Sequence, residues 1–198
     1  MPVSNSSRTR LIAMNNLYYA GPASVLQQTG GLIFPNQPDI VYNQSVNYTP
    51  YNLTHTNYTT FAYGSTPSPT IQITAQFSNV TAQEHEYTQG VIHFLRSVTK
   101  MFYGEGDLRR SPVAGTPPPV LRFSSFGATQ FNNVPVLVGN VSVPFQSDTD
   151  LVEYNGIALP AVQTIALDLL VTVNPAKQKN QFSKSGFVSG SLYNGGFI

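Results

Sequence analysis

Apolar and polar residues alternate along 70–77, and this alternation predicts a half-buried β-strand. Its apolar face carries Ile71, Ile73, Ala75 and Phe77. Three later runs, 120–126, 134–143 and 162–173, have the same strand-like composition. Both faces of the last run are largely apolar, with Asp168 as its one charge, so we expect it to be covered on two sides.

The stretch 17–63 contains short apolar or aromatic segments, such as 32–34 and 40–42, between glycines and prolines. Gly30 and Pro35 are examples of these interruptions. Because glycine and proline terminate regular elements, the pattern favours short strands and long loops and argues against a helix in this part.

A helix is predicted over 81–103. Thr81 and Glu84 match a capping box, in which each side chain satisfies a backbone N–H at the start of the helix. Gly104 is placed where a C-terminal cap is expected. Apolar residues recur along this segment mainly at spacings of three and four and form one stripe on the helix. They are Tyr87, Val91, Phe94, Leu95, Val98 and Phe102.

These elements predict a mainly β, α+β fold with one flanking helix. We expect an N-terminal arm over 1–16, a β domain over 17–175 and a C-terminal arm over 176–198. The C-terminal arm is polar and basic, and its isolated hydrophobic residues would dock on a partner. The anchors are Phe182, Phe187, Leu192, Tyr193, Phe197 and Ile198.

Charged residues make up only 10% of the 198 residues, against roughly 25% in a typical soluble domain. This leaves two interpretations: a β-sandwich with a polar, uncharged surface, or a subunit whose surface is mostly covered by neighbours. The formal net charge of +1 does not indicate a basic surface that would bind nucleic acid or an anionic membrane. No apolar run has the length of a membrane span, and cysteine is absent.

The chain offers few groups for catalysis, so we expect no enzyme, no cofactor and no metal site. The histidines lack metal-ligand spacing, and His93 is assigned a surface or interface role. Asp148, Asp150 and Glu153 form the densest acidic cluster, which is more typical of a solvated turn than of a cation site. Arg109-Arg110 lies in a proline-rich turn and is interpreted as solvated.

Several blocks in the same order carry a family resemblance. They are TPSPTIQITAQFSNVTAQEHEYTQGVIHFLRSVTKMFYG (66–104), AGTPPPVLRF (114–123), VPVLVGN (134–140), LPAVQTIALDLLVTVNP (159–175) and the terminal GSLYNGGFI. Together they resemble the baseplate–tail tube junction proteins of contractile-tailed phages, including the tube initiator and baseplate tube cap of T4-like phages. The likeness extends over most of residues 30–198.

The resemblance implies a tail-tube fold, a β-sandwich or small barrel with one helix, assembled as a hexameric ring. It also implies a virion protein, made in the host bacterial cytoplasm, that joins the baseplate hub to the tail tube and initiates tube assembly. Its partners would be the tail tube protein or a second junction ring, the hub and the tape measure protein. DNA would pass through the lumen without specific binding. Asp168 is expected at a lumen or interface position.

Two alternatives stay open. A carbohydrate-binding β-sandwich of a receptor-binding or fibre-associated module is consistent with 11 tyrosines, although tryptophan is absent. The tube protein of another contractile injection system would share the fold and differ in copy number.

Overall fold

The computed structural model describes residues 7–104, 114–127, 130–145 and 149–198. Its largest element is a seven-stranded antiparallel sheet of order β2-β1-β7-β8-β11-β6-β3. The strands are β1 Arg10–Ala13, β2 Leu32–Ile33, β3 Asp39–Asn43, β6 Thr70–Ser78, β7 Leu121–Ser125, β8 Phe131–Ser142 and β11 Val162–Val171. The predicted mainly β, α+β class is confirmed. Within the described residues one sheet of seven strands and two sheets of two strands are all open, so the expected barrel is not formed.

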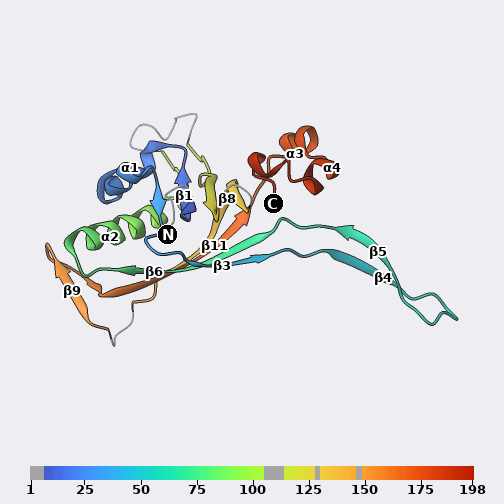
Figure 1. Ribbon diagram of the computed structural model, residues 1–198, viewed down its shortest axis with the longest axis horizontal. Coiled ribbons are helices and arrows are strands. Elements are labelled where there is room, and N and C mark those ends of the chain that lie inside the picture. The colour runs from blue at the N-terminus through green and yellow to red at the C-terminus, as the bar shows by residue number, and fades with distance from the viewer. Residues whose placement is uncertain (1–6, 105–113, 128–129, 146–148) are drawn as a thin grey trace.

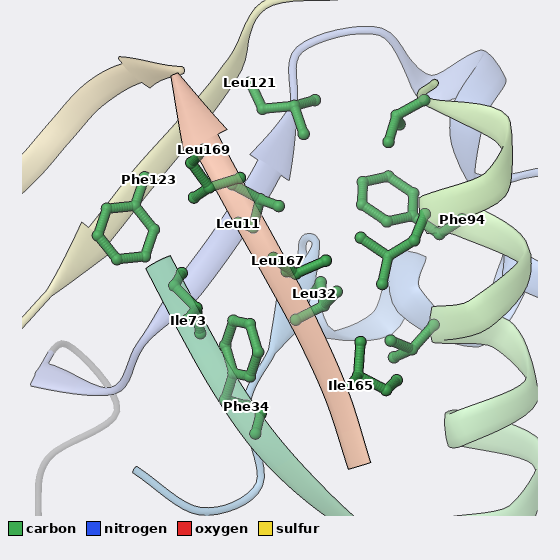
Figure 2. Close-up of a cluster of buried hydrophobic side chains, with 14 of the residues drawn as sticks. Leu11, Leu32, Phe34, Ile73, Phe94, Leu121, Phe123, Ile165, Leu167 and Leu169 are labelled. Atoms are coloured by element: carbon green, nitrogen blue, oxygen red, sulfur yellow. The ribbon is translucent and has the colours of Figure 1, made fainter. Parts of the chain in front are cut away.

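Alternation along the neighbouring strands β6 and β11 places one face of the sheet in the core. Ile73 pairs with Leu167 in register, and Ile71 pairs with Leu169. All four side chains are buried. Figure 2 shows Ile73, Leu167 and Leu169 on the side of the sheet that faces Phe94.

The expectation that the strand at 162–173 is covered on two sides is wrong for this chain. In β11 the residues facing the core are buried, whereas Leu170 on the other face is 44% exposed and Asp168 is half-buried. The helical layer lies on one side of the sheet (Figure 1), so a second cover can come only from outside the described residues.

Helix α2, Ala82–Ser97, begins as predicted. The Thr81 hydroxyl accepts from the backbone N–H of Glu84 at 3.3 Å, and the Glu84 carboxylate accepts from the Thr81 N–H at 3.0 Å. Its end was predicted wrongly, because Val98 and not Gly104 caps it. The β-branched pair Val98-Thr99 disfavours continuation. Beyond that pair, the backbone of Phe102 forms a bridge with Thr116.

Short helices occupy the stretch in which none was expected. They are η2 Asn16–Tyr19, η3 Gly21–Ser24 and α1 Val25–Thr29. Pro22 stands in the first turn of η3, and Gly30 caps α1 in the left-handed conformation at φ 69°. Glycine and proline therefore act here as helix starts and stops. The adjacent strand β1 comes from the segment expected as an N-terminal arm, so part of 1–16 belongs to the sheet.

Two hairpins extend from the sheet at opposite ends (Figure 1). One consists of β9 Leu151–Tyr154 and β10 Ile157–Pro160 and packs beside the start of α2. There the Tyr154 hydroxyl donates to the carbonyl of Val80 at 2.9 Å, and its ring lies edge-on to His85. The other hairpin consists of β4 Asn47–Tyr51 and β5 Thr60–Ser65.

The segment expected as a C-terminal arm is helical over much of its length. Helix α3 spans Pro175–Gln181, α4 spans Lys184–Val188 and the single turn η5 spans Tyr193–Gly195. Asn174 caps α3 by accepting from the N–H of Ala176 at 2.8 Å. These helices lie beside the base of the β4–β5 hairpin (Figure 1).

Candidate assembly interface

The β4–β5 hairpin projects far beyond the rest of the molecule (Figure 1). All five residues of β4 are exposed. Each strand of the hairpin forms hydrogen bonds with its partner strand along one edge only. The outer edge of each strand forms no ladder with another described strand. Unpaired strand edges bind further strands readily, and soluble proteins usually protect them with charged residues.

This hairpin lacks that protection. No Asp, Glu, Lys or Arg occurs between Asp39 and Glu84. Its surface instead presents large side chains, namely Tyr48, Tyr51, Leu53, Tyr58, Phe61 and Tyr63, each more than half exposed. Tyr48 and Tyr63 pack edge to face across the two strands at 6.2 Å between ring centroids. An exposed apolar ribbon of this kind is typical of a protein-binding surface.

A groove of about 600 Å³ lies at the base of the hairpin, and we call it the C-terminal groove. Tyr42 and Tyr63 line it from the hairpin side, and Phe182, Phe187 and Phe197 line it from the C-terminal segment. None of the described side chains that line it is charged. Its size is within the range of sites that hold small ligands or a few side chains.

The C-terminal segment is held to its own chain. Phe197 is 6% exposed and lies 5.8 Å from the ring of Phe182, and the ammonium group of Lys177 stands 5.4 Å from the Phe197 centroid. Asn132 of β8 donates from Nδ2 to Oδ1 of Asn194 at 2.9 Å. A Cβ at Gly196 would lie 2.7 Å from the carbonyl oxygen of Asn133, so only glycine permits this close approach.

The structure brings four of the sequence-predicted anchors together in the groove: Phe182, Phe187, Phe197 and Ile198. Phe182 and Phe187 remain partly exposed, whereas Phe197 is buried and Ile198 packs on the core. Leu192 is half-buried and Tyr193 is exposed, and neither lines the groove. These residues stay predicted interface positions.

Asp168 lies on the open face of the sheet, away from the groove. Its Oδ2 accepts from Nδ2 of Asn140 at 3.1 Å, and its register partner on the other side is Gln72. Val41 follows Gln72 in the same row. Asp168 is the one charged residue in this row across four strands.

His93 is exposed on α2 and lies apart from both features. With Arg96, Phe145 and Ile157 it lines a shallow depression of about 220 Å³. Glu84, at the other end of α2, has a lowered pKa, because the Thr81 backbone and side chain stabilise its carboxylate.

Among the described residues, no group of three or more His, Asp or Glu side chains could hold a metal ion. Asp148 and Arg109-Arg110 lie outside those residues, so the acidic cluster and the arginine pair stay untested. Within the same described part, no helix is long and apolar enough to cross a membrane.

Sequence reasoning missed the hairpin as a functional element. Its signal was available in the long interval without charge and in the frequent aromatic residues of 48–63. Short strands and loops were expected there, and nothing local shows that two strands will pair away from the sheet.

No protein family model matches the sequence, and no curated protein matches it. Among solved structures, the chain is similar to a chain from the tail of an empty GTA particle, determined with six-fold symmetry. The two are 7% identical, and the alignment covers 88% of this chain and 96% of the other, with a TM-score of 0.37. A likeness this distant carries no part of the argument below.

Proposed function

We propose that this protein is a structural subunit of a phage tail, and that it forms a hexameric ring between the baseplate hub and the tail tube. The observation that carries the proposal is the uncharged, exposed β4–β5 hairpin. A solitary soluble chain gains nothing from such a ribbon and risks aggregation through it. A subunit that is covered by identical neighbours uses it as an interface.

The open face of the sheet supports the same proposal. Its central row, Val41–Gln72–Asp168–Asn140, carries little charge. In the ring this face lines the lumen, where DNA and the tape measure protein pass. A basic lining would bind the phosphate backbone and retain DNA, whereas a nearly uncharged one lets it slide.

The position within the tail rests on the ordered sequence blocks from 66 to 198, which resemble junction proteins of contractile tails. The partners are then the tail tube protein or a second junction ring on one side and the baseplate hub on the other. The ring initiates polymerisation of the tube.

Native mass spectrometry and electron microscopy of the full-length protein, alone and mixed with its baseplate hub, test the proposal. We expect six-fold rings, and addition of tail tube protein to those rings should start tube growth without a lag. A monomer under all of these conditions contradicts the proposal.

A second candidate is carbohydrate binding in the C-terminal groove, favoured by one observation. Tyr42 and Tyr63 lie there with the amides of Gln44 and Gln178, and aromatic rings and amides are the groups that stack on and hydrogen-bond to sugars. A glycan array with the full-length protein tests it, and no binding to any glycan rejects it.

A further inference from the structure

The tip of the β4–β5 hairpin is not covered by any other described part of the chain. Tyr58, between the two strands, is 87% exposed, and Leu53 on the same connection is also exposed. A strand rises about 3.3 Å per residue, so the ten residues from Gln44 to Leu53 place the tip roughly 30 Å from the base. The pairing of β4 with β5 holds that separation.

The C-terminal groove lies at the opposite end of the same ribbon. Tyr42, Gln44, Tyr63 and Thr66 at the base form one wall, and Phe182 and Phe187 form part of the other. The hairpin cannot fold back onto this groove without breaking the β4–β5 ladder. A hairpin tip that fills the groove therefore comes from another copy of the chain.

The groove and the tip have matching chemistry. The described lining of the groove has no charged side chain, and the hairpin has none either. A partner segment with charged residues would bury them against uncharged lining side chains, which is costly. Aromatic and short polar side chains, such as those of the tip, bury apolar area and leave hydroxyls and amides to pair with Gln44 and Gln178.

We propose that the hairpin tip of one copy occupies the C-terminal groove of the next copy, with Tyr58 as the central anchor. This inference rests on the proposed function and assigns the contact that builds its ring. Tip and groove are different surfaces, so the contact is head-to-tail, and repetition of such a contact generates a closed ring or an open helix.

Crosslinking tests the contact directly, because the chain contains no cysteine. A double variant, Asn57→Cys with Ser68→Cys, keeps Tyr58 and places one thiol beside it at the tip and one at the groove. With a short bismaleimide we expect a ladder of covalent species up to the hexamer on a denaturing gel. Each single variant should give dimers at most.

The matched control moves the first thiol to Tyr103, which is 77% exposed and lies outside the hairpin. Tyr103→Cys with Ser68→Cys should give no ladder. A ladder of equal intensity in this control, or none in the tip variant, overturns the inference.

Tyr58→Ser provides a second measurement without added thiols. Because aromatic anchors dominate interface energetics, we expect at least about a tenfold loss in the apparent association constant. Tyr103→Ser should leave association unchanged, and circular dichroism should show both variants folded, since both side chains are exposed. Equal association of the two variants overturns the inference.

The outcomes separate the two proposals. Rings that form without tip-to-groove crosslinks would contradict the proposed contact but not the proposed hexameric ring. Open polymers that carry these crosslinks support the contact and contradict the hexameric ring.

Discussion

The ring of Tyr19 stacks on the ring of Phe94, with centroids 5.4 Å apart and planes 3° from parallel. The Tyr19 hydroxyl also accepts from the backbone N–H of Ala13 at 2.7 Å and donates to its carbonyl at 3.2 Å. One buried side chain thus joins helix α2 to strand β1. It fixes the helical layer on the sheet and leaves the other sheet face open.

Tyr19→Phe keeps the stack and removes the hydroxyl. The buried Ala13 amide loses a partner, so we expect a loss of about 1–3 kcal/mol in the free energy of unfolding at neutral pH. Urea unfolding measures it. Tyr58→Phe, at an exposed position, is the control and should change stability by less than about 0.5 kcal/mol. Equal stability of both variants would show that the Tyr19 hydroxyl contributes nothing.

The same variant has a signature at high pH. Burial raises the pKa of Tyr19, and the bond with Ala13 lowers it only in part. The folded state therefore keeps the proton more tightly than the unfolded state. Stability is intact below about pH 10 and falls as the pH rises through the raised pKa. Tyr19→Phe should lose less stability than the wild type as the pH rises above about 10. Parallel curves would contradict this expectation.

Gly90 is the point at which α2 approaches η3 and α1. A Cβ there would lie 2.9 Å from the carbonyl oxygen of Pro22 and 2.6 Å from Cγ2 of Val25. Gly90→Ala gains helix propensity but overpacks this contact, so we expect a net loss of about 1–2 kcal/mol. Thermal unfolding measures it, with the exposed Gln83→Ala as control. A more stable Gly90→Ala protein would disprove the close approach.

The capping box gives a further prediction. Thr81→Ala removes the hydroxyl that accepts from the Glu84 N–H, and N-cap losses of this kind cost about 1 kcal/mol. Thr81→Ser retains the acceptor and should behave almost as the wild type does in chemical unfolding. If the serine variant is as unstable as the alanine variant, the cap is not the cause.

Glu84 extends this prediction to acid pH. Hydrogen bonds from the Thr81 backbone, then its side chain, lower the Glu84 pKa. The stabilisation is therefore present above about pH 4.3, the pKa expected in the unfolded state, and is lost as the pH falls through the lowered pKa. Glu84→Gln should flatten the pH dependence of stability in this range, whereas the exposed Glu86→Gln should not.

Local signals explain which parts of the fold could be predicted. The strand at 70–77 follows from the alternation of apolar and polar residues, and the start of α2 follows from a capping box of four residues. Both were predicted correctly. The helix was predicted to continue through Phe102, but the backbone of Phe102 lies beyond the Val98 cap and pairs with Thr116 fourteen residues later. No local pattern shows such a distant partner.

The candidate interface was predictable only in part. Phe182, Phe187, Phe197 and Ile198 were expected as anchors, and they do gather in one groove. However, Phe197 is buried on its own chain, because the tight fit of Gly196 against Asn133 turns the terminus inward. The pairing that carries the hairpin away from the sheet is a tertiary feature, so its residues were missed.

The docking of the C-terminal segment gives the last prediction. Phe197→Ala removes a buried ring that contacts Phe182 and Lys177. Truncation of a buried phenylalanine costs about 3 kcal/mol or more, and here we expect the loss to appear as local detachment of the segment from β8, which it meets at Asn194 and Gly196. Trypsin should then cleave after Lys177, Lys179 and Lys184 about 100-fold faster, as mass spectrometry of the fragments would show. Phe187→Ala, at a partly exposed position, should accelerate cleavage far less. The strands β6 and β11 should remain protected from hydrogen exchange in both variants, because Ile73 and Leu167 of these strands lie on the sheet face toward Phe94 of α2. Global loss of protection in Phe197→Ala would instead make the C-terminal segment an integral part of the core.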